Sequence, residues 1–161
     1  MTDLRFAAGD ELTAAELYAL LTLRVDVFVV EQKAPYPELD GRDLRPDTGH
    51  LWSPPTGEPQ GYLRLLREPD GGWRIGRVCT TQAARGTGLG ARLMAEAMTR
   101  IGDDDAVLDA QTYAQRFYAR FGFAPEGDPF DEDGIEHITM RRQGRGKPSS
   151  VRPRPPVGRS G

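Results

Sequence analysis

The sequence predicts an α/β fold in which a mixed central β-sheet is flanked by helices. Hydrophobic periodicity changes along the chain in the order strand, helix, three strands, helix, strand, helix and one or two last strands. The three consecutive strands indicate an antiparallel meander, whereas the later alternation of strand and helix indicates a crossover. The length of 161 residues suits one domain rather than two.

The first part of the chain predicts a strand, a helix and a long loop. Apolar and polar or small residues alternate over positions 4–8, as in a strand. The stretch "TAAE" offers Thr13 as N-cap and Glu16 three residues later, and apolar residues at helical spacing carry the helix toward Val30. Residues 32–49 are dense in Pro, Gly and Asp, and because long loops in compact domains usually serve function, we expect a binding loop there.

The rest of the chain alternates between strand and helix patterns. Asp70, Gly71 and Gly72 form a strong hairpin signal, and Gly102 and Gly122 stand where helices end. The expected elements are strands at 50–53, 61–68 and 73–80, a helix at 89–101, a strand at 106–110, a helix at 111–121 and a final strand at 135–142.

Composition excludes several classes of protein. Cys79 is the single cysteine, so no intramolecular disulfide can form, and no Cys/His spacing of a metal site occurs. No apolar run is long enough to span a bilayer, and the acidic start does not resemble a secretory signal, so we expect a cytoplasmic protein. All 24 acidic residues precede position 141, against 14 Lys and Arg there. A body charge of about −10 makes nucleic acid an unlikely main partner.

The C-terminal end has the opposite charge. Seven Lys and Arg fall in the last 21 positions, among Gly, Pro and Ser with almost nothing apolar to bury. We therefore expect residues 1–143 to form the domain and residues 144–161 to be a disordered basic tail. A contact of this tail with RNA or an acidic surface stays open beside the simpler interpretation as a solvated extension.

The segment "QAARGTGLGARLM", residues 82–94, indicates a phosphate site. Gly86, Gly88 and Gly90 precede a helix, where converging backbone N–H groups and the helix N-terminus favour an anion. A triphosphate loop needs Lys followed by Ser or Thr, which is missing here. A dinucleotide loop needs one more residue between its glycines, and only about 55 folded residues remain beyond it, too few for such a domain.

Counting Arg85 into the motif, "RGTGLG" reads R-x-x-G-x-G and resembles the pyrophosphate loop of the GNAT (Gcn5-related N-acetyltransferase) superfamily. "QTYAQRFYARFGF" resembles a second motif of that superfamily, with Gln111 where Asn is commoner. Gln111, Ala114 and Tyr118 would share one helix face. A finer resemblance, to the ElaA-like branch, covers almost all of residues 5–142 and includes the stretches "LRVDVFVVEQKAPYPELDGRDLRPDTGHL", "GRVCTTQAARGTGLG" and "FDEDGIEHITM".

The resemblance implies the GNAT fold and an acetyl-CoA-dependent N-acetyltransferase that acts on a primary amine by direct attack in a ternary complex. The alternative is a catalytically silent module that binds or senses acetyl-CoA or CoA. No metal is implied. The implied cofactor-binding residues are Val78, Cys79, Thr80, Arg85, Gly86, Thr87, Gly88, Leu89, Gly90, Ala91 and Gln111.

The resemblance also implies that Tyr118 protonates the CoA sulfur, unless it is a core aromatic residue. An amine with a pKa of about 10 must lose a proton, so a base or a water chain is needed. The candidates are His137, Glu31 and His50, with the first two preferred; each has a structural interpretation as well. Cys79 could carry the acetyl group, but a small apolar strand residue is the better interpretation.

Acidic residues gather in two places that would flank one mouth if the resemblance holds. They could attract a cationic amine, or they could form an ordinary solvated face. The acceptor is then a small or peptidic amine, and a homodimer is also open. The residues are Glu31, Glu38, Asp40, Asp43 and Asp47 in the first loop, and Asp131, Glu132, Asp133 and Glu136 near the end.

Overall fold

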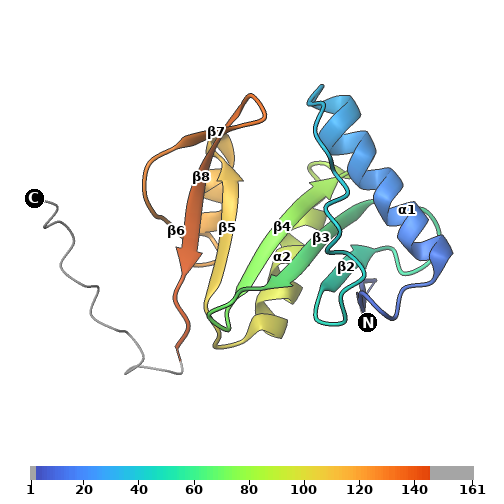
Figure 1. Ribbon diagram of the computed structural model, residues 1–161, viewed down its shortest axis with the longest axis horizontal. Helices are drawn as coiled ribbons and strands as arrows, with labels where there is room; N and C mark the ends of the chain where they lie inside the picture. The colour runs from blue at the N-terminus through green and yellow to red at the C-terminus, as the bar shows by residue number, and fades with distance from the viewer. Residues whose placement is uncertain (1–2, 146–161) are drawn as a thin grey trace, which may run out of the picture.

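The computed structural model describes residues 3–145 and confirms the predicted α/β fold with a mixed sheet and flanking helices (Figure 1). In chain order the elements are β1 (Arg5–Ala8), α1 (Ala14–Arg24), the π-helix η1 (Val25–Glu31), β2 (Gly49–Ser53), β3 (Gly61–Arg67), β4 (Trp73–Thr80), the 3₁₀ turn η2 (Gln82–Ala84), α2 (Leu89–Ile101), β5 (Ala106–Gln111), the 3₁₀ turn η3 (Thr112–Ala114), α3 (Gln115–Ala119), β6 (Ala124–Pro125), β7 (Phe130–Glu132) and β8 (Ile135–Arg142).

The sheet has the strand order β1-β2-β3-β4-β5-β8-β6, and β7 also pairs with β8. β2, β3 and β4 form the predicted antiparallel meander, and β1 extends it by pairing antiparallel with β2. β4 and β5 pair in parallel because α2 crosses between them, and within residues 3–145 this is the one parallel pair of the sheet. It lies in the middle of the sheet, where its divergence creates the site described below.

The first helix begins as its sequence predicts. The Thr13 hydroxyl accepts from the Glu16 N–H at 3.0 Å, and the Glu16 carboxylate accepts from the Thr13 N–H at 3.0 Å, which completes a capping box. The helix continues to Glu31, close to the expected end, but its last seven residues are wound as a π-helix. Such turns are rare and often lie at functional sites.

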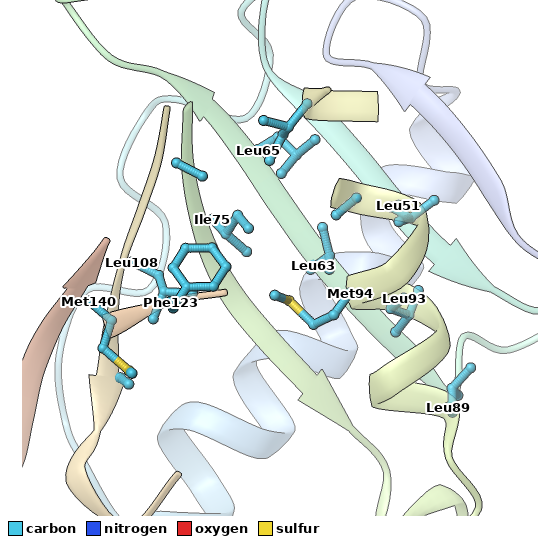
Figure 2. Packing of buried hydrophobic residues seen from close by; sticks show 14 of the residues in the cluster. Leu51, Leu63, Leu65, Ile75, Leu89, Leu93, Met94, Leu108, Phe123 and Met140 are labelled. Carbon is cyan, nitrogen blue, oxygen red and sulfur yellow. The ribbon is translucent and has the colours of Figure 1, made fainter. Parts of the chain in front are cut away.

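Two apolar clusters hold the layers together. On one face of the sheet, α2 packs Leu93 and Met94 against Leu63 and Ile75 of the central strands, as Figure 2 shows. On the other face, α1 and η1 pack against β1 to β4 through a smaller cluster that includes Tyr62, whose side chain is fully buried. Each face of the meander is therefore covered, which explains why β2 and β3 are buried almost throughout.

The helix predicted over residues 111–121 is wrong in its first part. Gln111 is the last residue of β5 and pairs with His137 of β8, and a 3₁₀ turn precedes the five-residue α3. Strand pairing with β8 extends β5 beyond the point where helical periodicity begins, because tertiary pairing overrides local propensity. Gln111 consequently does not share a helix face with Tyr118.

The predicted tail lies mostly outside the described residues. Its first two residues are attached to the body, because the Gly144 N–H donates to Asp105 Oδ1 at 2.5 Å and the Arg145 N–H donates to the Asp103 carbonyl at 3.1 Å. The proposed disorder of the other tail residues therefore stays a prediction.

Candidate functional site

The site lies where β4 and β5 separate. The two strands pair from Trp73 and Ala106 only as far as Ile75 and Leu108, so the second half of β4 has no partner on that side. A bulge in β4 adds to the divergence: Arg77 and the residue after it oppose a single residue of β3, and Arg77 has a positive φ of 55°.

A cavity of about 770 Å³ opens at this divergence. It is bounded by η1, the first loop, β3, β4, β5, the η3–α3 segment and the β7–β8 hairpin. The predicted site residues that line it are Glu31, Val78, Cys79, Thr80, Arg85, Gln111, Tyr118 and His137. The cavity is therefore lined by residues that are far apart in the sequence and that come from both motifs and from both ends of the domain.

The β4 residues Val78, Cys79 and Thr80 do not all face the cleft through their backbone. The Thr81 N–H donates to the carbonyl of Gln60, which directly precedes β3. Because successive residues of a strand point their backbone N–H and C=O groups to opposite sides, Cys79 points its groups toward β3. Val78 and Thr80 point theirs toward β5. Burial raises the pKa of the Cys79 thiol to about 12. A neutral thiol in this position agrees with its interpretation as a small strand residue.

The glycine loop presents several free backbone N–H groups. Gly86 and Gly88 have φ of 79° and 86°, which only glycine adopts without strain, and an added Cβ at either would meet open space. The N–H groups of Arg85 and Thr87 donate to carbonyls of η2 and are already used. Within residues 3–145, the predicted loop positions whose N–H groups have no acceptor are Gly86, Gly88, Gly90 and Ala91.

Arg85 and Glu31 form a two-point ion pair beside this loop. Arg85 Nη1 and Nη2 donate to the two Glu31 oxygens at 2.6 and 2.9 Å, and Nη2 also donates to the Thr80 carbonyl at 3.0 Å. The hydrogen bond from Arg85 lowers the pKa of Glu31, so this carboxylate is ionised and a weaker base than a free one. The pair joins the end of η1 to the glycine loop.

Tyr118 lines the cavity and also packs against the larger apolar cluster. Its ring packs edge-on against Phe117, with the centroids 5.0 Å apart. The hydroxyl has no hydrogen-bond partner within residues 3–145. Burial raises the pKa of Tyr118 well above its ordinary value, so the hydroxyl carries its proton at neutral pH.

The two histidines have different environments. His137 lines the cavity, its ring stacks on Phe130, and its Nδ1 lies 2.8 Å from the Ile135 carbonyl. A carbonyl can only accept, so Nδ1 carries the hydrogen, and in the neutral ring Nε2 keeps a lone pair.

His50, the third candidate base, is fully buried and outside the cavity lining. Both of its nitrogens are occupied, with Nδ1 2.7 Å from the Tyr62 hydroxyl and Nε2 2.8 Å from the Asp43 carbonyl. Its surroundings make it a structural residue.

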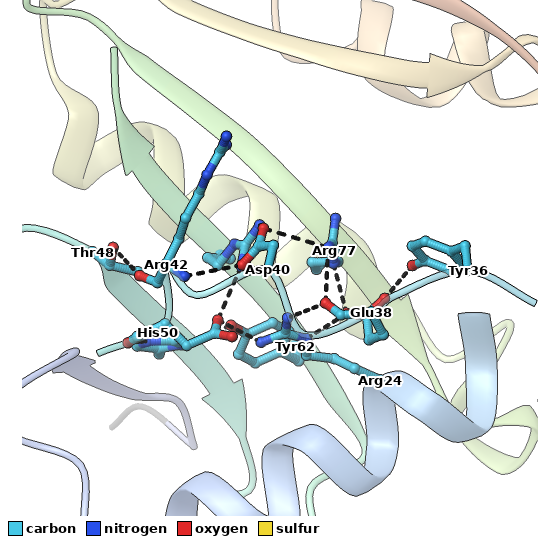
Figure 3. A network of polar contacts seen from close by, with 11 residues as sticks. Arg24, Tyr36, Glu38, Asp40, Arg42, Thr48, His50, Tyr62 and Arg77 are labelled. Atoms are coloured by element: carbon cyan, nitrogen blue, oxygen red, sulfur yellow. Dashed lines mark hydrogen bonds and ion pairs between the residues drawn. The ribbon is translucent and has the colours of Figure 1, made fainter. Parts of the chain in front are cut away.

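The expected open acids of the first loop are instead bound to arginines (Figure 3). Glu38 accepts from Arg24 Nε at 2.7 Å and from Arg77 Nε at 2.6 Å, and Tyr36 also donates to it. Asp40 and Asp43 accept from Arg64, and Asp43 also accepts from Arg24. We call the six charged residues Arg24, Arg64, Arg77, Glu38, Asp40 and Asp43 the buried ion network.

The buried ion network is a feature that sequence reasoning missed. A signal was present, because Arg24 continues the apolar stripe of α1 and Arg64 falls among the buried positions of β3. Arginines in such positions imply carboxylate partners, which the following loop supplies. The expectation that the loop acids attract a cationic amine is therefore wrong for Glu38, Asp40 and Asp43, whose charges are neutralised.

In the described part of the chain, His, Cys, Asp and Glu side chains do not gather in threes as metal ligands would. Between residues 3 and 145, no helix has the length and apolar character needed to cross a bilayer.

Comparison with known proteins identifies a family model and close relatives in sequence. Residues 28–143 match a family model described as an acetyltransferase (GNAT) domain. A UPF0039 protein of Mycobacterium tuberculosis is 49% identical over 148 residues, which cover 89% of this chain and 95% of the relative.

Solved structures agree with this match. An acyl-CoA N-acyltransferase from Pseudomonas aeruginosa is 46% identical, with a TM-score of 0.81 over 87% of this chain and 98% of the other. ElaA of Escherichia coli is 38% identical, with a TM-score of 0.82 over 89% of this chain and 100% of the other.

Proposed function

The chain belongs to the GNAT acetyltransferase family and has the fold of acyl-CoA N-acyltransferases, and from its site we propose that it is an acetyl-CoA-dependent N-acetyltransferase. In this proposal it transfers the acetyl group to a primary amine by direct attack in a ternary complex. The observation that carries the proposal is that Tyr118, the proposed acid, and Arg85 of the glycine loop line one cavity. We further propose that the protein acts in the cytoplasm.

The residues present fit acetyl-CoA. The free N–H groups of the glycine loop suit a pyrophosphate, which favours converging backbone donors at a helix N-terminus. The unpaired edge of β4 at Val78 and Thr80 suits the amide groups of a pantetheine arm, because it offers strand-like donors and acceptors. When bound, acetyl-CoA would supply the acetyl group as an activated thioester.

Two side chains would move the protons. His137 Nε2 accepts the proton that the amine loses as the new C–N bond forms. Tyr118 donates its hydroxyl proton to the sulfur as the C–S bond breaks, so the products are an amide and a neutral thiol. Tyr118 can take this role because a tyrosine, whose ordinary pKa is about 10, carries its hydroxyl proton at neutral pH, and because the residue lines the cavity.

We assign Glu31 a different role from the one first expected. Because Arg85 holds its carboxylate in the ionised form, Glu31 serves better as the anchor of Arg85 than as the base. Replacing His137 by Gln should lower kcat and leave the KM for acetyl-CoA largely unchanged. Replacing Glu31 by Gln should instead raise the KM for acetyl-CoA and leave kcat largely unchanged.

The test of the proposed function is thiol release over a panel of amines, measured with a colorimetric thiol reagent. Saturable release that depends on both acetyl-CoA and an amine supports the enzyme. Acetyl-CoA binding without release from any amine supports the silent module instead. A thermal shift with NAD and none with acetyl-CoA would contradict both, since a bound ligand stabilises the folded state.

A further inference from the structure

The charges that line the cavity are mostly already paired. Arginines 64, 74, 77 and 85 each contact at least one carboxylate at 3.0 Å or less. Among the acids, Glu31, Asp40 and Asp109 are the partners of these arginines. Recognition of a charged acceptor must therefore depend on the residues that remain.

Arg42 is the cation that remains. It lines the cavity, its side chain is exposed, and within residues 3–145 its guanidinium forms no ion pair and no side-chain hydrogen bond. Figure 3 shows the side chain extending away from the neighbouring buried ion network. The network has three arginines and three carboxylates and is formally neutral, so Arg42 gives this wall a surplus positive charge.

The backbone of Arg42 is fixed even though its side chain is exposed. Its N–H donates to Asp40 Oδ1 at 3.1 Å, and its carbonyl accepts from the Thr48 hydroxyl at 2.8 Å. Asp40 is itself held by Arg64, which is buried. Because the backbone is already ordered, binding costs only the entropy of the side chain, and the planar guanidinium donors match a carboxylate at two points.

Beyond the loop wall, the cavity carries the opposite charge. Glu132 and Asp133, from the β7–β8 hairpin, also line it, and within the described residues neither forms an ion pair. They stand on the same hairpin as His137, the proposed base. One wall thus favours a carboxylate and the other favours an ammonium group.

We propose that the acceptor is a small amine that also carries a carboxylate, and that Arg42 binds this carboxylate. This inference rests on the proposed function, which it narrows from primary amines in general to zwitterionic ones. The neighbouring Arg64 is held by Asp40 and Asp43. Within residues 3–145 this leaves Arg42 as the cavity-lining arginine of this wall that is available to a carboxylate.

The test compares acceptors that differ only in the carboxylate. The pairs are lysine with cadaverine, and ω-amino carboxylates of increasing length with the corresponding alkylamines. In the protein with Arg42 intact, kcat/KM should be at least about tenfold higher for the carboxylate-bearing member, as expected for one charge-assisted contact. In Arg42→Gln the ratio between the two members should fall to near one, and Arg42→Lys should restore part of it because the charge returns without the planar fork.

Arg45→Gln is the matched control, because Arg45 is an exposed arginine of the same loop that does not line the cavity. It should keep the full ratio. The same pairs are also titrated by calorimetry into the CoA-saturated protein, so the inference is decided even if no amine is acetylated. An equal ratio before and after Arg42→Gln, or tighter binding of the diamine, would overturn the inference. Absence of thiol release with all amines would overturn the proposed function alone.

Discussion

Replacing Glu38 by Gln tests whether the buried ion network holds the first loop in place. Glu38 is 3% exposed, and one of its oxygens accepts from both Arg24 and Arg77. Gln keeps the size of the side chain but removes the charge. It leaves the guanidinium of Arg24, which is fully buried, with Asp43 as its remaining carboxylate.

The expected loss of unfolding free energy follows from this geometry. Removing one partner of a buried ion pair costs about 3 to 5 kcal/mol, and the lower end applies because Asp43 still neutralises part of the charge on Arg24. A loss of about 3 kcal/mol should lower the melting temperature of a domain of this size by roughly 6 to 12 °C. The acceptor KM should rise as well, because the loop that carries Arg42 is anchored through this network.

The assay is urea and thermal unfolding, with Glu96→Gln as the control. Glu96 pairs with Arg100 at 2.9 Å on the exposed side of α2, four residues apart, and such surface pairs contribute less than about 0.5 kcal/mol. High salt should reduce the small effect of the control and leave the Glu38 effect largely intact, since buried pairs are poorly screened. If Glu38→Gln were as mild as Glu96→Gln, the network would not stabilise the loop as argued.

Three further predictions concern the proton donor, the phosphate loop and pH. Tyr118→Phe should lower kcat about 100-fold or more with a small effect on the KM for acetyl-CoA, and unchanged turnover in the thiol assay would eliminate the acid role. Gly88→Ala places a side chain at φ 86°, which costs about 1 to 2 kcal/mol, and it should raise the KM for acetyl-CoA. The control is Gly71→Ala in the β3–β4 turn, which is strained equally at φ 93° and should lower stability without raising that KM. Burial lowers the pKa of His50 below its usual 6.5, so the unfolded chain binds its proton first. The contribution of the buried neutral His50 to the free energy of unfolding is complete above pH 6.5. It decreases as the pH falls below 6.5, by at most about 1.4 kcal/mol per pH unit. Urea unfolding between pH 7.5 and 5.5 should show a shallower decline in His50→Gln, and an equal slope would contradict this assignment.

The fold was largely predictable because its signals are local. The capping box at Thr13, the hairpin glycines and the apolar face of α2 each act over a few residues, and the structure places these elements where the patterns indicate. The end of β5 at Gln111 was not predictable in the same way, because it depends on pairing with β8, 24 or more residues later in the chain. The π-helical end of the first helix also lacks a signal in periodicity.

The candidate site, like the fold, was predictable only where its sequence signals are local. The glycine loop is a continuous segment, so its glycines could be identified from their spacing, and the structure adds which of its N–H groups have no acceptor among residues 3–145. The wall that carries Arg42 depends on contacts between α1, the first loop, β3 and β4. Whether each acid of the loop is paired with an arginine could therefore not be predicted from its neighbours in sequence. The expectation of an acidic mouth is therefore wrong for this wall, where the described residues form a neutral network beside Arg42, whereas Glu132 and Asp133 of the β7–β8 hairpin do line the cavity.

Arg77 gives the network a role beyond stability. The same residue forms the bulge that turns β4 away from β5 and binds Glu38 on the first loop through Nε and Nη2. A buried ion pair is often no more stable than an apolar replacement, so its retention needs another reason. Here the pair fixes the distance between the strand that would hold the thioester and the loop that would hold the acceptor. An apolar contact at this position could pack equally well, but it would not set the register of the loop along β4, and Arg42 would lose its fixed place opposite the cleft.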